Sequence, residues 1–414
     1  MFTSPPIACG ARLLDRPAQD TPYALNRVRR LAAWASVVGA LVWTTSALAA
    51  GYVVTDLVAN KKPLVDGNGI VHNATNVDAN LQNPWGVGES TGSPFWVSDN
   101  HAGLSTLYNT AGTPLSLVVS IPAPGDPLGN GGSPTGLVFN PAQASGAFPV
   151  SGVDTSNNPI TRPAVFLFDT EDGTILGWNP NVNPPGFDPA KAGTYAIIVI
   201  DNSASGAIYK GLAISSSGAG GKPTLYATNF HGGTIDAYDG TTPPPWSPAT
   251  LADNGFTDPK LQRGYAPFNV VPVGGKLFVT YAIQDEDAAD DVSGMGHGVV
   301  DTYDFDGNML SRFAQHGQLN SPWGVVQAPA SFGALAGSIL IGNFGNGQIN
   351  GFDPTTGELV DKLRNAHGQA VVIEGLWTVM FGNGGNGGRQ DTLYFTAGPN
   401  DETDGLFGSI APSP

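Results

Sequence analysis

The sequence Asn-Pro-Trp-Gly-Val at residues 83–87 returns as Ser-Pro-Trp-Gly-Val at residues 321–325. Two short apolar runs follow each copy, within residues 95–108 and residues 339–352. A repeat of this length is typical of an architecture in which each unit is one supersecondary element that buries its apolar face against its neighbours. The repeat therefore indicates how the chain is built before any single side chain is considered.

Weaker copies of the same pattern occur elsewhere in the chain. Each has a short polar or Gly-containing phrase followed by two runs rich in Val, Ile, Leu, Phe and Tyr, and they begin near residues 133, 209, 266 and 374. The set amounts to about six units at a spacing of roughly 50–60 residues, with one longer gap, which is in the range of β-propeller blades.

Each unit has the pattern of short β-strands bounded by turns. Asp-Gly pairs at residues 172–173, 239–240 and 306–307 suit hairpins, because both residue types tolerate positive φ. No segment after residue 50 shows a sustained helical period. We therefore predict an all-β fold, a six-bladed β-propeller. An array of β-sandwiches is the alternative, and long units that share one opening phrase fit it less well.

Closure of the ring is the next requirement of such a fold. The last unit ends at residues 406–410 without an obvious outer strand, whereas residues 52–58, Tyr-Val-Val-Thr-Asp-Leu-Val, form a spare one. We predict that this N-terminal strand pairs with the last blade and so removes an exposed sheet edge.

The N-terminus has the features of a targeting segment. Arg27, Arg29 and Arg30 precede an apolar stretch at residues 31–43, and Ala-Leu-Ala at residues 47–49 is a cleavage signal. We predict a signal peptide with an N-terminal extension over residues 1–49 and a single propeller domain over residues 50–414, exported to the periplasm or the extracellular space. An uncleaved anchor is the alternative. The mature chain then lacks cysteine, because Cys9 is the only one.

The net negative charge of the chain limits the kinds of molecule that it is expected to bind. The chain has 18 Lys and Arg against 34 Asp and Glu, and removal of residues 1–49 leaves 13 against 32, a formal charge of −19. Such a surface repels phosphate backbones and anionic lipid, which argues against nucleic-acid binding and against membrane insertion after signal cleavage. The expected partner is a small molecule, a polymer or an extracellular protein.

Several phrases together resemble a family of uncharacterised secreted bacterial propellers, some of whose members end in a PEP-CTERM sorting tail. The phrases that carry the resemblance lie at residues 83–86, 166–173, 209–212, 227–231, 264–269 and 396–402. The resemblance implies a six-bladed propeller and export, and it brings no established activity. This chain ends without the sorting tail. In architecture alone it is also similar to NHL-type propellers and to calcium-dependent lactonase propellers.

Polar residues at the strand starts and turns are expected to surround the mouth of the central channel. Asn83, Glu171 and Lys210 are among those that should reach this face. Asparagine recurs there, and we predict that five of them bind a ligand: Asn100, Asn229, Asn269, Asn343 and Asn400. The alternative is turn chemistry, since Asn tolerates a left-handed backbone and often ends strands.

An acidic loop at residues 284–291 is the sharpest local feature. Crowded carboxylates repel one another, and calcium would relieve this repulsion. The predicted metal ligands are Asp285, Asp287, Asp290 and Asp291. Their spacing is not that of an EF-hand loop, and a solvated acidic loop is the alternative.

Catalytic groups are harder to identify. His101 and His231 each follow a strand that ends in Asn and would act as bases or metal ligands, whereas the alternative is exposed turn histidines. Glu374 is the third candidate. The tryptophans of the repeat, Trp85, Trp323 and Trp377, are expected to pack between adjacent blades, with a stacking platform for a sugar or aromatic ligand as the alternative.

Three functions follow from these residues. The first is a ligand- or protein-binding module without catalysis. The second is a calcium-dependent hydrolase or lactonase, with the ion in the central channel. The best channel ligands for such an ion are Glu374, Asn229, Asn269 and Asn343. The third is a propeller-type lyase with His101 or His231 as general base. The sequence does not decide whether the protein is an enzyme.

Overall fold

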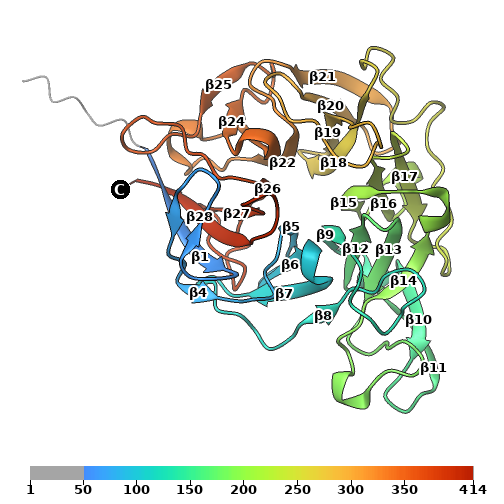
Figure 1. Cartoon of the computed structure of the whole chain (residues 1–414). Coiled ribbons are helices and arrows are strands. Elements are labelled where there is room, and N and C mark those ends of the chain that lie inside the picture. The colour runs from blue at the N-terminus through green and yellow to red at the C-terminus, as the bar shows by residue number, and fades with distance from the viewer. Residues whose placement is uncertain (1–50, 414) are drawn as a thin grey trace, which may run out of the picture. The chain divides into compact units, whose positions relative to one another are not determined.

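The computed structural model describes residues 51–413, which form a ring of six β-sheets around a central axis (Figure 1). The predicted six-bladed propeller is confirmed. Within this part of the chain the helices are 3₁₀ turns of three residues, and no helix there is long and apolar enough to cross a membrane. The predicted signal peptide, residues 1–49, lies outside the described residues.

Each blade begins with its innermost strand. Blade 1 contains β5 (Pro84–Gly88), β6 (Phe95–Asp99), β7 (Leu104–Tyr108) and β8 (Val119–Ser120). Blade 2 contains β9 (Pro134–Phe139), β12 (Phe166–Thr170), β13 (Thr174–Trp178) and β14 (Ile197–Asp201). Blade 3 contains β15 (Tyr209–Ser215), β16 (Thr224–Asn229) and β17 (Thr234–Asp239).

The second half of the ring follows the same plan. Blade 4 contains β18 (Tyr265–Val273), β19 (Lys276–Ile283), β20 (Val299–Tyr303) and β21 (Met309–Gln315). Blade 5 contains β22 (Pro322–Gln327), β23 (Ile339–Asn343), β24 (Ile349–Phe352) and β25 (Leu359–Lys362). Blade 6 contains β26 (Leu376–Phe381), β27 (Leu393–Ala397), β28 (Leu406–Pro412), β1 (Tyr52–Ala59) and β4 (Asn76–Val77).

Short elements connect the blades. Two hairpins lie outside them, β2 (Leu64–Val65) with β3 (Val71–His72), and β10 (Pro149–Val153) with β11 (Pro159–Pro163). The second extends outward from the blade 2 side of the ring (Figure 1). The 3₁₀ turns are η1 (Asn100–Ala102), η2 (Gln143–Ser145), η3 (Pro189–Lys191), η4 (Ser203–Ser205), η5 (Ala219–Gly221), η6 (Gly333–Leu335) and η7 (Phe344–Asn346).

The N-terminal strand closes the ring, as predicted. β1 runs antiparallel to β28, with Tyr52 opposite Pro412 and Ala59 opposite Leu406, and the blue β1 lies beside the red β28 in Figure 1. The Tyr52 hydroxyl also donates to the Phe332 carbonyl of blade 5 at 2.8 Å. The two ends of the chain are therefore joined by backbone hydrogen bonds, which protects an edge that would otherwise be open.

Every innermost strand carries a β-bulge at the same place. In five blades the register slips after the first residue pair, and in blade 4 it slips after the third pair, Pro267 with Tyr281, so that the inner strand has one residue more than the second strand there. A bulge re-aims the side chain at that position. The first bulged residues of blades 1 to 6 are Trp85, Thr135, Lys210, Phe268, Trp323 and Trp377. All six of these equivalent residues are buried.

The second bulged residue governs how closely neighbouring blades approach. In four blades it is glycine, and a Cβ on Gly324 would lie 2.7 Å from the Trp377 carbonyl oxygen. In the other two blades a side chain bonds the next blade instead. Asn269 Nδ2 donates to the Trp323 carbonyl at 2.9 Å, and Thr378 Oγ1 donates to the Trp85 carbonyl at 2.7 Å. The inner strands therefore hold one another around the axis.

Aromatic rings fill the axis itself. Trp85 stacks on Trp377 with ring centroids 3.5 Å apart, and Phe344 stacks on Trp377 at 4.0 Å. Trp323 meets both tryptophans edge-on, at 6.2 and 5.8 Å. We call Trp85, Phe230, Phe268, Trp323, Phe344 and Trp377 the aromatic plug.

The tryptophans do pack between adjacent blades, Trp85 of blade 1 and Trp323 of blade 5 each against Trp377 of blade 6, but they do so where the inner strands converge and not in the wedge that widens outward. They pack against one another across the axis, because the bulges lie where the six inner strands converge.

Candidate functional site

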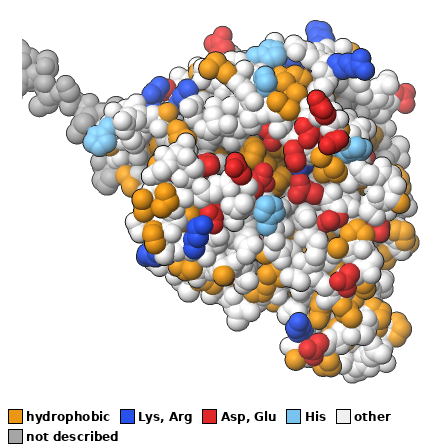
Figure 2. Space-filling model, in the orientation of Figure 1, with side chains coloured by type: hydrophobic (Ala, Val, Ile, Leu, Met, Phe, Trp, Pro, Cys, Tyr) orange, Lys and Arg blue, Asp and Glu red, His pale blue; other side chains and the backbone are white. Residues whose placement is uncertain are grey.

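The mouth is the face at which the inner strands begin, on one side of the aromatic plug. Acidic side chains gather toward the middle of the face shown in Figure 2. At the mouth six polar residues from five blades form a hydrogen-bonded group that we call the axial network. Its members are Asn83, Asn100, Glu171, Lys210, Asp290 and Glu402.

Lys210 is the only cation of the axial network. Its side chain is 2% exposed, and its ammonium lies 2.5 Å from Glu171 Oε1 and 2.9 Å from Asp290 Oδ1. It also lies over the Trp85 ring, 5.2 Å from the centroid. Burial alone would lower the pKa of Lys210, but the two carboxylates raise it above its ordinary value. Lys210 therefore places a positive charge at the bulge position that Trp occupies in blades 1, 5 and 6.

Amide side chains extend the network from Lys210 across the mouth. Asn100 Nδ2 donates to Glu171 Oε2 at 2.9 Å, and Asn83 Nδ2 contacts Asn100 Oδ1 at 3.3 Å. Asn83 Nδ2 also donates to Glu402 Oε2 at 2.6 Å. Asn83 Oδ1 accepts from Trp377 Nε1 at 3.0 Å, which joins the network to the plug beneath it. Groups hundreds of residues apart are thus held in one geometry.

Glu402 is the carboxyl group of the network whose pKa is raised. Burial raises its pKa to about 7, and the nearby Glu171 charge adds to this. Its loop is strained, because Asn400, Asp401 and Glu402 all have positive φ, at 59°, 50° and 65°. Strain of this kind persists where surrounding structure enforces it, and it clusters at binding sites. The loop presents a carboxyl group that is half protonated near neutral pH.

A polar cleft of about 620 Å³, the rim cleft, lies beside the network between blades 5 and 6. It is lined by Gly67, Asn68, Phe344, Gly345, Asn346, Gly347, Val372, Glu374, Gly375, Asn400 and Asp401. The Glu374 carboxylate accepts from the Gly67 and Asn400 amides at 2.5 and 3.2 Å. Asn400 Nδ2 donates to the Val65 carbonyl at 2.8 Å, so the β2–β3 hairpin forms one wall of the cleft.

The five predicted asparagines do not form one ring. Asn100 belongs to the axial network and Asn400 lines the rim cleft. Asn343 Nδ2 donates to the Gln318 carbonyl at 2.7 Å, and Asn229 Oδ1 accepts from the Gly232 amide at 3.0 Å, as in a turn. Asn269 is bonded to the next blade at its bulge. Two of the five therefore lie in the candidate site.

The acidic loop lies at the mouth, but its aspartates have separate partners. Asp290 binds Lys210, Asp291 Oδ2 accepts from Ser293 Oγ at 3.0 Å, and Asp285 Oδ1 accepts from the Ala289 amide at 2.8 Å. Asp287 is exposed. Among residues 51–413, no three His, Cys, Asp or Glu side chains are grouped to hold a metal ion. Calcium binding by this loop stays a prediction.

The predicted histidines lie at the mouth turns and are exposed. The His231 ring lies beside Gly206, 3.7 Å from where a Cβ on that glycine would be. A role for His101 or His231 in catalysis stays a prediction.

Sequence reasoning placed Asn83, Glu171 and Lys210 at the mouth but assigned them no role, and it noted Glu402 only as part of a weaker oxygen-rich turn. One usable signal was the single Lys at a repeat position that elsewhere holds an aromatic residue or Thr.

No family model matches the chain. Comparison with curated proteins finds relatives. The uncharacterized protein L690 of Acanthamoeba polyphaga mimivirus is 31% identical over 343 residues, which cover 81% of this chain and 82% of that protein. The uncharacterized protein R648 of the same virus is 29% identical over 350 residues, or 83% and 79% of the two chains. These relatives are viral, whereas the sequence resemblance pointed to bacterial proteins. Export and a sorting signal stay predictions.

Solved structures similar to this chain are distant. A streptogramin B lyase has 10% identity and a TM-score of 0.47 over 87% of this chain and 98% of its own. A PQQ-bound aldose sugar dehydrogenase from Streptomyces coelicolor has 16% identity and a TM-score of 0.43 over 88% and 99%. At this level of similarity they assign no residue and no activity to this chain.

Proposed function

The chain belongs to the family that includes the uncharacterized mimivirus protein L690, and from the geometry of its mouth we propose that it is a binding module for a saccharide unit. The ligand is a free sugar or one unit of a polymer, and it occupies the rim cleft. The observation that carries this proposal is the cleft itself, whose volume of about 620 Å³ falls within the range of roughly 300–1,000 Å³ of small-ligand sites.

The chemistry of the cleft matches that of a sugar. Phe344 lines the cleft while one of its faces stacks on Trp377, so an aromatic ring held rigidly in place is available to the apolar side of a pyranose. Asn68, Asn346 and Asp401 also line it and offer amide and carboxylate groups. Hydroxyl groups both donate and accept, and such a mixture satisfies them.

Charge favours a neutral or cationic ligand over an anionic one. Glu374 and Asp401 line the cleft, and Glu402 follows on the same loop. Lys210 is bonded to both Glu171 and Asp290, so this group of three keeps a net negative charge beside the cleft. An anion in the cleft would be repelled by these carboxylates at close range. A neutral saccharide avoids this cost.

Preorganisation is the contribution of the axial network. Asn83 and the loop of positive φ at residues 400–402 form one wall of the cleft. The β2–β3 hairpin forms another. A site that is fixed before the ligand arrives loses little conformational entropy on binding.

Titration calorimetry of the purified protein with neutral hexoses and disaccharides, and with glucuronic acid for comparison, tests this proposal. We expect binding of a neutral sugar and none of the uronic acid. Asp401→Ala and Phe344→Leu should each weaken affinity about tenfold. The matched control is Asp287→Ala, which removes an exposed carboxylate of the acidic loop and should leave affinity unchanged. A protein that binds no neutral sugar at millimolar concentration contradicts the proposal.

A second candidate function is acid–base catalysis, and the pKa of Glu402 favours it. A carboxyl group with a pKa of about 7 is suited to general acid or base chemistry at neutral pH. In this reading the protein is a hydrolase or lactonase in which Glu402 activates water beside the bound ligand. Turnover of sugar lactones that rises with pH through about 7 and is lost in Glu402→Gln would support it.

The calcium-dependent form of this hydrolase requires ligands outside the Lys210 cluster. In that cluster the Lys210 ammonium already pairs with the carboxylates of Glu171 and Asp290. Of the predicted channel ligands, Asn229, Asn269 and Asn343 are bonded to backbone groups, and Asp290 of the acidic loop is bonded to Lys210. An ion would therefore be held by Glu374 or by the other aspartates of the acidic loop, where it would polarise a carbonyl group. If chelation leaves both the melting temperature and activity unchanged, this form is excluded. The lyase form requires a histidine base, and full turnover by His231→Ala would remove that residue from it.

A further inference from the structure

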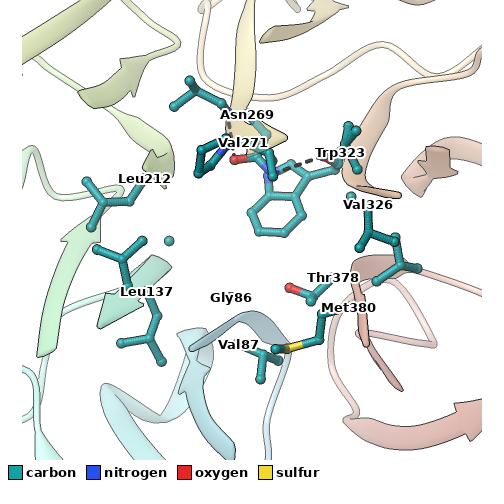
Figure 3. Close-up of a pocket in the computed structure, with 17 residues that line it drawn as sticks. Gly86, Val87, Leu137, Leu212, Asn269, Val271, Trp323, Val326, Thr378 and Met380 are labelled. Atoms are coloured by element: carbon teal, nitrogen blue, oxygen red, sulfur yellow. Dashed lines mark hydrogen bonds between the residues drawn. The ribbon is translucent and has the colours of Figure 1, made fainter. Parts of the chain in front are cut away.

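A second cavity lies where the inner strands of the blades converge (Figure 3), and its lining residues include those that follow the bulges. It has a volume of about 210 Å³ and is lined by the inner strands of all six blades. One apolar residue represents each blade in the wall: Val87, Leu137, Leu212, Val271, Val326 and Met380. We call this cavity the axial well.

The plug separates the axial well from the rim cleft. Well residues such as Leu212 and Val326 follow the bulge in their strands, whereas Asn83 precedes it. The Trp323 indole lines the well and also meets Trp85 and Trp377 edge-on. Figure 3 shows this indole directed into the open space of the well. The tryptophan is therefore shared between the plug and the wall of the well.

The polar side chains of the well are already bonded. Asn269 donates to the Trp323 carbonyl and accepts from the Val270 amide at 2.8 Å. Thr378 donates to the Trp85 carbonyl, and Trp323 Nε1 donates to the Lys210 carbonyl at 2.9 Å. These groups therefore have few free donors or acceptors for hydrogen bonds to water. The rest of the side-chain lining is aliphatic, apart from the thioether of Met380.

The well opens on the face opposite the mouth. Leu137, Leu212 and Val325 are buried near the bulges, whereas Val326 and Met380, further along their strands, are half-buried. Exposure thus rises along the inner strands away from the plug. A ligand has a route to the well that does not cross the plug or the saccharide site.

We propose that the axial well binds a small apolar molecule of the size of one aromatic ring. An apolar protein cavity of about 150 Å³ accommodates benzene, so 210 Å³ leaves room for a somewhat larger ring. Trp323 offers an aromatic contact and Met380 a sulfur contact to such a ring. Water in the well has few partners, so its displacement by an apolar group is favourable. This site is independent of the saccharide site.

Fluorine NMR of fluorobenzene with the intact protein measures the binding. We expect saturable binding that weakens at least tenfold in Val326→Phe, because the larger side chain extends from a half-buried position into the well. Val360→Phe is the matched control, since it makes the same exchange at an exposed position of β25. It should leave the affinity unchanged. No saturable binding, or equal loss in both variants, overturns the proposal.

Methionine methyl NMR measures binding to the unmutated protein, so it does not depend on whether a variant folds. In carbon-labelled protein, benzene should shift the Met380 methyl resonance by its ring current, because Met380 lines the well. Met295 is 89% exposed and serves as the internal control. Shifts of equal size at both methionines would show unspecific partitioning and refute the site. Asp401→Ala should leave the Met380 shift intact, so failure of the saccharide proposal is distinguishable from failure of this one.

Discussion

The ammonium of Lys210 lies 2.5 Å from Glu171 Oε1, and the residues come from adjacent blades. The same ammonium binds Asp290 of blade 4. Three blades are therefore tied together by one buried cation at the axis. A charge in such a position stabilises the fold only while its partners remain, since removal of one member leaves others uncompensated.

Lys210→Met should lower the free energy of unfolding by about 2 kcal/mol. The effect is smaller than for a fully buried pair because Asp290 is 74% exposed and Glu171 is 27% exposed. Denaturant unfolding at pH 8 measures it. Lys191→Met, at an exposed lysine of the blade 2 surface, is the control and should change little. The double variant Lys210→Met/Glu171→Gln should regain part of the loss; if it does not, the ion pair is not the cause.

Glu402→Gln should change how stability depends on pH. The pKa of Glu402 is raised from 4.5 to about 7 in the folded protein, mainly by burial. The group therefore weakens the fold as pH rises from 4.5 toward 7, because ionisation costs more in the folded state than in the unfolded chain. The variant lacks this penalty.

The gain in Glu402→Gln should be on the order of 2–3 kcal/mol at pH 8 and near zero at pH 4. Unfolding free energies of both proteins across this range provide the measurement. Other buried carboxyl groups, Asp169 among them, are common to both curves and cancel in the difference. Parallel curves would mean that Glu402 does not titrate in this interval.

His72 should make the β2–β3 hairpin sensitive to pH. A hydrogen bond to Asp56 raises the His72 pKa, burial opposes this, and Asp66 adds to the rise. The two carboxylates lie 3.2 and 3.5 Å from its ring nitrogens. The stabilisation is complete below the ordinary pKa of 6.5 and is lost as pH rises through the raised value.

Hydrogen exchange over residues 64–72, corrected for intrinsic rates, checks this. Protection should be greater at pH 6 than at pH 8, and His72→Ala should remove the difference. Because the Gly67 amide donates to Glu374, saccharide affinity should weaken over the same interval. A hairpin with equal protection at both pH values would contradict the role of His72.

Gly324→Ala should destabilise the ring by about 1–3 kcal/mol. A Cβ there would lie 2.7 Å from the Trp377 carbonyl oxygen and 2.9 Å from the Val379 amide nitrogen. Backbone of the next blade cannot yield without disturbing the plug. Gly131→Ala is the control, because its Cβ would meet only Ala123, at 3.7 Å. Thermal unfolding compares the two, and equal melting temperatures would refute close inter-strand contact at the bulge.

The ring of blades could be predicted because its signals are local. The phrase at residues 83–87 and its return at residues 321–325 mark equivalent inner strands, and the apolar runs after them mark the strands that follow. The spare strand at residues 52–58 was identified by the same pattern and pairs with β28 as expected. Alternation and turn residues act over a few positions, so a single sequence displays them.

The site depended on side-chain direction, which no local pattern contains. A one-residue slip in each inner strand turns Trp85, Trp323 and Trp377 onto the axis, and the repeat alone does not reveal that slip. The meeting of Lys210 with Asp290, 80 residues away, and of Asn83 with Glu402, 319 residues away, requires the ring to close first. The amino-acid pattern thus specified the blades and their order. The closed ring specified which charges meet, because only closure brings distant turns to one axis and buries Lys210 among them.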